Sequence, residues 1–309
     1  MQFPSLLLAV LLTSQTALAA LPLRLVTFNI RYDASGRESG EKPWFDIFCW
    51  ASSSRCREPH VVSMLNSIVN AAPSGAPTVI GLQEVLDNQL KDIKNDLDGS
   101  WAHVGVARDD GSTKGEYAPI LYRTDQLRVL AWETKWLSPT PDQVSFGWGA
   151  GSRRITTTAV FEHLATGEKF IHANVHLDNV SAQARQEGIK VALTRIQAAR
   201  VAYGPLAVSL TGDFNSAPYS DAFQTLANTG FFQGEMYDLA QPNKVSGSLR
   251  TTYTTFEPEN SPGSRLDFIW LGAKDGFPYT VNKYEVIDNN YEGMIISDHR
   301  PVVGDVTLN

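Results

Sequence analysis

Short apolar runs separated by polar turn segments recur along most of the chain, and they predict a protein rich in strands. The runs are dominated by branched and aromatic residues, as in buried strands. They cover residues 23–30, 77–82, 120–123, 127–137, 155–162, 169–177, 206–210, 252–256, 266–271, 279–287 and 301–308. Apolar residues at helical spacing predict helices over 58–71, 87–97, 181–202 and 221–227. Many strands with a few interspersed helices favour a sheet-rich α/β domain, in which two packed sheets are flanked by helices.

The first twenty residues differ from the rest of the chain. Residues 6–12 are apolar, and residues 17–19 (Ala-Leu-Ala) supply the small side chains of a cleavage site, although the segment lacks Lys and Arg. Polar residues at 13–16 interrupt the apolar run before it could span a bilayer. We predict that residues 1–20 are a secretory signal peptide. Residues 21–309 then form a single domain of a secreted, extracellular protein, since no linker or composition shift divides them.

The two cysteines, Cys49 and Cys56, close a short loop. In an exported protein such a pair is expected to form a disulfide, and two free thiols are the alternative. A pair alone does not make a structural zinc site, which needs four ligands. A glycosylation sequon begins at Asn179, and the sequence does not determine its occupancy.

Composition narrows the class of partner. The chain has 309 residues, of which 43% are hydrophobic, and this suits one large domain with a sizeable core. Its net charge of −7 argues against avid binding of polynucleotides, although a local basic patch can sit on an acidic protein. No segment after the N-terminus is long and apolar enough to span a membrane, and no long apolar hairpin is evident. We therefore expect no stable membrane insertion, and we expect a monomer.

Polar residues stand at the ends of several predicted strands, where burial would cost free energy unless the groups are paired. A shared metal site would explain many such groups at once. The positions are Asn29, Glu84, His176, Asp213, Asn215, Asp267, Asp298 and His299. Taken singly, each has an ordinary interpretation as a turn residue, a helix cap or a structural histidine. Their occurrence together and in this order is the functional signal.

The most specific segments are LQEV at 82–85, TGDFNSAP at 211–218 and SDHRPV at 297–302. With the other strand-end residues, they resemble the endonuclease/exonuclease/phosphatase superfamily from about residue 23 to residue 308. The segment HLDNVSAQAR at 176–185 is similar to a secreted microbial branch of that family. The resemblance implies a four-layer α-β-β-α sandwich of two packed mixed sheets flanked by helices, with the site at one edge of the sheets.

The resemblance also implies a metal site. Glu84 matches the main metal-binding carboxylate of the family, and Asn29 and Asp298 would help to hold the ion or its waters. Mg²⁺ prefers oxygen ligands and keeps several waters, so these few protein ligands suffice. The expected cofactor is Mg²⁺, with Mn²⁺ as a substitute.

The remaining strand-end residues take catalytic roles by the same resemblance. Asp213 and Asn215 match the pair that orients and activates the attacking water. His299 and His176 would contact the scissile phosphate, and Asp267 would hold His299 in the correct tautomer. The implied reaction is an in-line displacement without a covalent intermediate.

Three further residues are candidates for substrate binding at the rim of the site. Arg31 follows Asn29 closely and could reach a phosphate, while Tyr117 and Arg154 are expected to line the rim. An exposed loop residue or an ordinary strand-end residue is the alternative in each case.

The resulting prediction is a secreted, Mg²⁺-dependent hydrolase of phosphate esters, with a phosphodiester favoured over a monoester. The substrate candidates are a nucleotide, a nucleic acid, a phospholipid headgroup and a sugar phosphate. A catalytically silent binding protein on the same scaffold is the alternative of a different class. A glycosidase is disfavoured, because it needs two paired carboxylates rather than amide and histidine partners.

Overall fold

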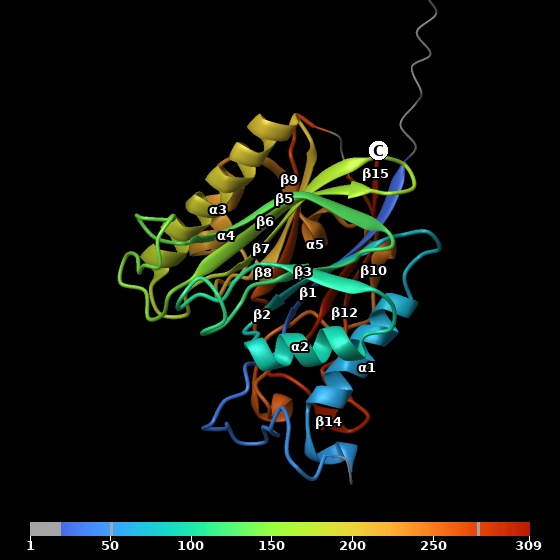
Figure 1. The fold of residues 1–309 in the computed structure, drawn as a ribbon, viewed down its shortest axis with the longest axis vertical. Helices are drawn as coiled ribbons and strands as arrows, with labels where there is room; N and C mark the ends of the chain where they lie inside the picture. The colour runs from blue at the N-terminus through green and yellow to red at the C-terminus, as the bar shows by residue number, and fades with distance from the viewer. Residues whose placement is uncertain (1–19, 50–51, 277–278) are drawn as a thin grey trace, which may run out of the picture.

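The computed structural model describes residues 20–49, 52–276 and 279–309 (Figure 1). Apart from Ala20, the predicted signal peptide lies outside the described residues. In the described part of the chain, no helix is both long and apolar enough to cross a membrane.

Two large sheets form the centre of the molecule. The seven-stranded sheet has the order β10 (Val245–Ser246), β12 (Tyr279–Val286), β15 (Val302–Leu308), β1 (Leu21–Asn29), β2 (Thr78–Gln83), β4 (Ile120–Arg123) and β3 (Trp101–Val104). The six-stranded sheet has the order β5 (Leu127–Trp136), β6 (Ile155–His163), β7 (Lys169–His176), β8 (Ala207–Asp213), β11 (Asp267–Gly272) and β9 (Phe232–Glu235). Both sheets are mixed, because β1 runs parallel to β2, and β7 to β8, among antiparallel neighbours. β13 (Asn290–Tyr291) and β14 (Met294–Ile295) pair separately.

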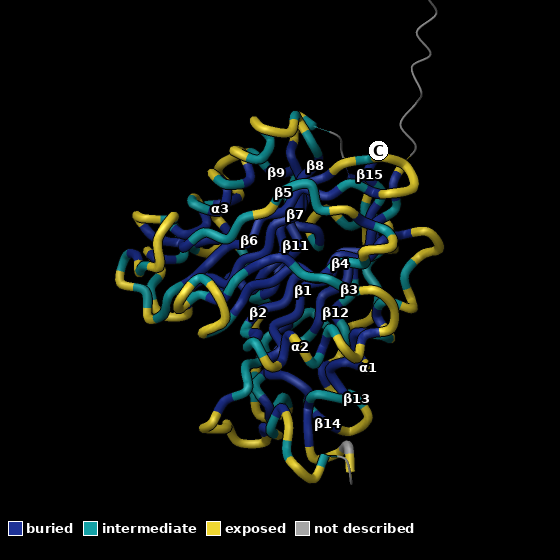
Figure 2. The backbone as a smooth tube through the Cα atoms, viewed as in Figure 1, coloured by how far each residue is buried: buried dark blue, intermediate teal, exposed yellow. Residues whose placement is uncertain are grey.

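Helices cover the outer faces of both sheets (Figure 1). One face packs against α1 (Glu58–Asn70) and α2 (Asp87–Asp96), and the other against α3 (Ala182–Tyr203) and α4 (Asp221–Asn228). A third apolar cluster lies between the sheets and includes Met236 of the short helix α5 (Met236–Leu239). The predicted four-layer α-β-β-α sandwich is therefore confirmed, and Figure 2 shows that its sheets are buried.

The alternation of side chains along β1 positions the first candidate residue. Leu23 and Leu25 belong to the cluster between the sheets, whereas Val26 and Phe28 pack under the helices. Because side chains two apart share a face, Asn29 points to the same side as Leu25, toward the other sheet. The end of β1 thus presents a polar group to the end of β8.

Near the edge that carries the predicted site residues, the two sheets meet through a polar layer. A Cβ placed on Gly81 of β2 would lie 2.3 Å from Thr211 Oγ1 and 2.6 Å from Asn174 Oδ1, so the sheets approach more closely here than a side chain permits. Gln83 donates to Asn174 Oδ1 at 2.7 Å and to Thr27 Oγ1 at 3.0 Å. These hydrogen bonds pair most of the buried polar atoms of the layer, although Gln83 Oε1 has no partner.

Most predicted elements form within a few residues of their expected ends, but one strand does not. Residues 252–256 make only isolated bridges, from Tyr253 to Ser264 and to His299. The hydroxyl of Thr252 instead accepts the backbone N–H groups of residues 266 and 267, so the segment supports the start of β11. The short strands β3 and β9 were not predicted, because neither begins with two branched apolar residues, as the equally short β4 does.

The loop between β1 and α1 contains the two cysteines. Cys49 and Cys56 form a disulfide with their Cα atoms 5.8 Å apart. The predicted pairing is therefore confirmed.

Candidate active site

Asn29, at the end of β1, is the centre of a polar cluster that draws on both sheets. Its Nδ2 donates to Glu84 Oε1 at 3.1 Å and to Asp213 Oδ2 at 3.0 Å. Its backbone oxygen accepts the hydroxyl of Ser297 at 2.7 Å. Asn29 is completely buried. The amide of Asn29 therefore bonds a residue that lies 184 positions further along the chain.

Glu84 follows β2 in a left-handed backbone conformation, with φ of +60°. Few non-glycine residues adopt this conformation, and it is found preferentially at functional sites. The turn brings Glu84 Oε1 to Asn29, and Oε2 accepts the backbone N–H of Tyr32 at 3.3 Å. One carboxylate is thus held by the last residue of β1 and by the segment that follows it.

Asp213, at the end of β8, lies between two histidines. Its Oδ2 is 3.7 Å from Nε2 of His176 and 3.7 Å from Nε2 of His299. Asn215 donates its backbone N–H to Asp213 Oδ1 at 2.8 Å, and its Nδ2 lies 3.3 Å from His176 Nε2. Asp213 and both histidines are nearly or fully buried. The predicted catalytic residues therefore converge on one small volume.

His299 is held by a second carboxylate. Its Nδ1 is 2.8 Å from Oδ2 of Asp267, the first residue of β11. The backbone N–H of Asp267 donates to Thr252 Oγ1, and the ring of Tyr253 packs 5.1 Å from the imidazole. The hydrogen bond at Nδ1 leaves Nε2 facing Asp213, which is the orientation that a substrate-facing imidazole requires.

The two histidines differ in charge because their surroundings differ. Burial alone would lower the pKa of His299, but the carboxylates of Asp267 and Asp213 outweigh burial and hold that pKa well above its usual value. At His176, burial and the neighbouring guanidinium of Arg154 lower the pKa to about 3. The site therefore contains one cationic and one neutral imidazole at neutral pH.

Asp298 lies beside Glu84 and is 5% exposed. Burial raises its pKa to about 6, and the charge of Glu84 adds to the shift even though His299 opposes it. Buried carboxylates that repel each other are stabilised by a bound cation, and the oxygen donors of Glu84, Asp298 and Asn29 suit a hard ion such as Mg²⁺. These three residues therefore fit the predicted metal site.

A second set of donors lies close by. Single ligand atoms of Asp213, Asp267 and His299 lie within 4.8 Å of one another. In this set Nδ1 of His299 already bonds Asp267, and its Nε2 is a nitrogen ligand that Mg²⁺ does not favour. The donors on the Glu84 side therefore suit Mg²⁺ better, and the second set is the competing arrangement.

The three rim candidates occupy different positions. Arg31 Nη1 lies 4.0 Å from Glu84 Oε2, while its other nitrogens pair with Glu41 and Glu38. Arg154 is 7% exposed, and its Nη1 lies 3.0 and 2.9 Å from the two ring nitrogens of His176.

Tyr117 differs from the other two rim candidates. The ring belongs to the core under α1 and α2, and the hydroxyl donates to Ser112 O at 2.9 Å and to Asp87 Oδ1 at 3.3 Å. Since this hydroxyl points to other partners and the ring is buried, we do not include Tyr117 among the substrate contacts.

Several supporting residues were not identified from the sequence. Glu41 accepts from Arg31 Nε at 3.3 Å and lies 3.7 Å from Arg57, and Thr252 and Tyr253 brace Asp267 and His299 as described above. None of them follows an apolar strand, so the pattern that located the other residues contains no signal for them. Their contacts depend on long-range packing.

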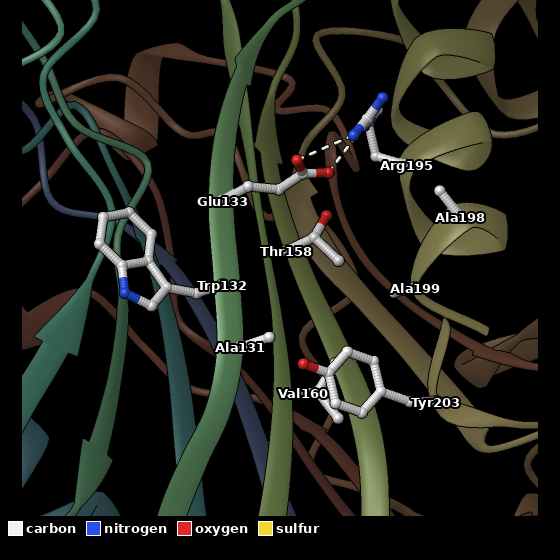
Figure 3. A pocket seen from close by; sticks show the side chains of 9 residues that line it. All are labelled: Ala131, Trp132, Glu133, Thr158, Val160, Arg195, Ala198, Ala199 and Tyr203. Carbon is white, nitrogen blue, oxygen red and sulfur yellow. Dashed lines mark hydrogen bonds and ion pairs between the residues drawn. The ribbon is translucent and has the colours of Figure 1, made fainter. Parts of the chain in front are cut away.

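A cavity of about 210 Å³ lies elsewhere, between β5, β6 and α3 (Figure 3). Glu133 and Arg195 line this cavity and form a bidentate ion pair, with N–O distances of 2.7 and 2.8 Å. None of the predicted site residues lines this cavity. The catalytic candidates instead lie at the sheet edge.

Comparisons with known proteins agree with the fold and the residue pattern. The model of the Endonuclease/Exonuclease/phosphatase family matches residues 26–299. A solved family member from Bacteroides vulgatus is 31% identical, with a TM-score of 0.75 over 93% of this chain and 99% of that chain. A mannosyl-6-phosphatase from Bacteroides thetaiotaomicron VPI-5482 is 27% identical, with a TM-score of 0.73 over 92% and 99% of the two chains. Another family protein from Bacteroides thetaiotaomicron is 26% identical, with a TM-score of 0.76 over 95% and 97%.

Proposed function

The chain belongs to the endonuclease/exonuclease/phosphatase family, and we propose that it hydrolyses a phosphate ester by in-line attack of an activated water. The observation that carries this proposal is the convergence of Asn29, Asp213 and His299 from distant parts of the chain on one edge of the paired sheets. Every acid, amide and imidazole position that the family resemblance implies is occupied in this chain. This favours an active enzyme over a catalytically silent binding protein.

Asp213 is the residue that orients and deprotonates the attacking water. Its carboxylate is fixed by Asn29 and by the backbone of Asn215, so it does not need to reorganise. Burial raises the pKa of Asp213, which makes its carboxylate a stronger base. The water oxygen bonds to phosphorus while the bond to the leaving alcohol oxygen breaks.

His299 and Asn215 stabilise the negative charge that develops on the phosphoryl oxygens. The protonated imidazole of His299 offers Nε2–H toward the reacting group, and Asp267 fixes its orientation through Nδ1. Donors held in place before the reaction contribute most to this kind of stabilisation. His176 and Arg154 extend the same donor surface on the other side of Asp213.

Glu84, Asp298 and Asn29 hold a divalent cation in this proposal. When bound, Mg²⁺ or Mn²⁺ offsets charge on the phosphate and on the leaving oxygen. The supporting observation is the pair of neighbouring carboxylates, one of them with a pKa raised to about 6 mainly by burial.

A cavity of about 310 Å³ with a mixed polar and apolar lining offers a place for the alcohol part of the substrate. Its lining includes Glu38, which forms an ion pair with Arg31. It also includes Thr255, and the preceding residue, Thr254, donates its backbone N–H to Asp298 O. The acidic lining disfavours a polyanionic leaving group.

The type of ester has two candidates. A phosphodiester is the prediction from the sequence. The likeness to a mannosyl-6-phosphatase favours a phosphomonoester, with a sugar phosphate as the substrate class. We retain both, because the same donors serve either reaction.

We also propose that the chain is exported. The support is the N-terminal apolar segment with its small-residue cleavage pattern, together with a disulfide between Cys49 and Cys56. Detection of the processed chain in the medium of an expressing host tests this, and retention of an unprocessed chain in the cytoplasm would overturn it.

Hydrolysis of bis(nitrophenyl) phosphate and of nitrophenyl phosphate, measured side by side, tests the main proposal. We expect nitrophenol release with Mg²⁺ or Mn²⁺, and loss of release in EDTA and in His299→Ala. The ratio of the two rates decides between a diesterase and a monoesterase. If neither compound nor a panel of nucleotides and sugar phosphates is hydrolysed, and the chain binds no Mg²⁺, the enzyme proposal fails.

A further inference from the structure

The loop between β1 and α1 exposes three large apolar side chains within four residues. Phe45 is 60% exposed, Ile47 is 70% exposed and Phe48 is 50% exposed. The loop lies at the end of the molecule opposite the C-terminus (Figure 1), and parts of it are drawn as exposed in Figure 2. Clustered exposed apolar side chains of this kind are typical of a surface that binds a protein, a membrane or a ligand.

Local contacts hold these side chains outward. The turn is closed by Cys49 N, which donates to Asp46 O at 2.9 Å, and by Phe48 N, which donates to Asp46 Oδ1 at 2.8 Å. The disulfide from Cys49 to Cys56 ties the turn to the start of α1. On the inner side, Trp44 is fully buried and its Nε1 donates to Asp92 Oδ2 at 2.9 Å. The exposed apolar side chains therefore belong to, or adjoin, a hydrogen-bonded turn at residues 46–49.

One cation of the same loop, Arg55, contacts this apolar group, and it shares a pocket with two more. Arg37, Lys42 and Arg55 line a surface pocket of about 340 Å³, and Asp46 is the acid that shares its lining. In the described part of the chain, none of the three cations takes part in an ion pair. The guanidinium of Arg55 lies 5.4 Å from the ring centre of Phe48.

Two further acids of the same loop are paired with cations outside this group, whereas Asp46 lies beside it. Glu38 and Glu41 pair with Arg31, and Glu41 also lies 3.7 Å from Arg57. On a chain with a net charge of −7, the loop thus presents a local basic and apolar surface. We call Phe45, Ile47, Phe48, Arg37, Lys42 and Arg55 the loop surface.

We propose that the loop surface docks on phospholipid membranes that carry anionic headgroups. Cations that lack acidic partners attract headgroup phosphates, and adjacent aromatic and aliphatic side chains enter the interface between headgroups and acyl chains. This combination distinguishes a lipid surface from a purely apolar partner, which would leave the three cations uncompensated. The docking is peripheral and reversible.

Docking would also orient the catalytic edge. Arg57 donates to Lys42 O at 2.9 Å and to Ile30 O at 2.8 Å, so the loop is fastened to the residue that follows β1. A membrane-bound molecule therefore keeps Asn29 near the bilayer. This step rests on the proposed function, whereas docking itself does not.

Sedimentation of the purified protein with vesicles tests the proposal. Vesicles of phosphatidylcholine alone are compared with vesicles of phosphatidylcholine mixed with phosphatidylserine. We expect binding to the mixed vesicles that weakens with added salt, and weaker binding to phosphatidylcholine alone. Arg55→Gln should lower the partition constant about fivefold, since one cation near an anionic surface contributes about that factor. Phe45→Ser with Ile47→Ser should lower it at least about tenfold, because two buried apolar side chains are lost.

Matched controls separate docking from general effects. Val201→Ser removes an 88% exposed apolar side chain from α3, and Lys169→Gln removes an exposed cation from β7, and neither should change binding. Nitrophenyl phosphate hydrolysis without vesicles should be the same in all variants, so that a failure of docking is distinguished from a failure of the enzyme proposal.

Three results would overturn the proposal. The first is absence of sedimentation with either vesicle type, and the second is binding that both loop variants leave unchanged. The third is a dimer on gel filtration that Phe45→Ser with Ile47→Ser dissociates, which would identify a second copy of this chain as the occupant.

Discussion

Asp213 and Asp267 stand directly opposite each other in the antiparallel pairing of β8 with β11, and the imidazole of His299 contacts both carboxylates. Residues in register on neighbouring strands point to the same face, so the sheet itself places the two acids at one edge. One acid bonds Nδ1 at 2.8 Å and the other lies 3.7 Å from Nε2. The pairing thus gives the ring a fixed orientation and a positive charge.

Asp267→Asn should lower kcat about 100-fold or more, because His299 loses both its orientation and the charge that keeps it protonated. Since Asp267 raises the pKa of His299, the alkaline limb of the pH–rate profile should move to lower pH in this variant. Steady-state kinetics across pH measure both effects.

Asp275→Asn is the matched control for this substitution. Asp275 is an exposed acid paired with Arg200 at 2.9 Å, away from the catalytic residues, and the variant should keep the wild-type profile. An Asp267→Asn enzyme with a lower kcat and an unmoved alkaline limb would mean that Asp267 acts only through structure.

Glu84→Gln should abolish most of the thermal stabilisation that Mg²⁺ provides. A ligand at about 100 times its dissociation constant stabilises the folded chain by about 2.7 kcal/mol, so a large part of that gain should disappear. Differential scanning fluorimetry with increasing Mg²⁺ measures the change.

The same titration on Asp267→Asn decides between the two donor sets. If the ion is held by Glu84, Asp298 and Asn29, Asp267→Asn should retain the stabilisation. In the reverse pattern, Asp267→Asn would lose the stabilisation by Mg²⁺ and Glu84→Gln would keep it. That result would place the ion at Asp213, Asp267 and His299.

Strand positions and the strand-end residues could be predicted from the sequence because both depend on local patterns. A buried strand needs an apolar run, and a polar group at its end is visible in the same segment. Glu84 and Asp213 were identified in this way, and the structure brings both to Asn29.

Other features depend on contacts that are distant in sequence. Residues 252–256 have the composition of a strand, but they form only isolated bridges. The hydroxyl of Thr252 accepts a hydrogen bond from the backbone N–H of Asp267. Tyr117 was a rim candidate from the sequence, but its ring packs in the apolar core under α1 and α2. Nothing local in the sequence distinguishes these outcomes.

Gly81→Ala should lower the free energy of unfolding by about 1–3 kcal/mol, the usual range for overpacking a dense interior. The added Cβ would meet Thr211 Oγ1 at 2.3 Å and Asn174 Oδ1 at 2.6 Å, and both groups are held by the polar layer between the sheets. Chemical denaturation measures the difference. Gly36→Ala, where no atom lies within 4 Å of the new Cβ, should be close to neutral, and equal effects at the two glycines would contradict this account.

His172 should make the protein sensitive to acid. The ring is fully buried in β7, between Ser209 Oγ at 2.8 Å and Thr211 Oγ1 at 3.1 Å, and burial lowers its pKa from the usual 6.5 to about 3. Between these two values the unfolded chain binds a proton that the folded chain does not. The stability contributed by neutral His172 is therefore complete above pH 6.5 and is lost as the pH falls toward 3.

The loss from this one group amounts to about 1.4 kcal/mol per pH unit within that window. His172→Gln cannot take up the proton, so the difference in unfolding free energy between wild type and variant should shrink steadily as the pH falls from 6.5. Urea denaturation at a series of pH values measures this difference. For Val201→Ser, an exposed substitution on α3, the difference from wild type should not change with pH. A His172→Gln difference that is equally constant would show that the ring takes up its proton without unfolding, so that the polar layer between the sheets tolerates a charge.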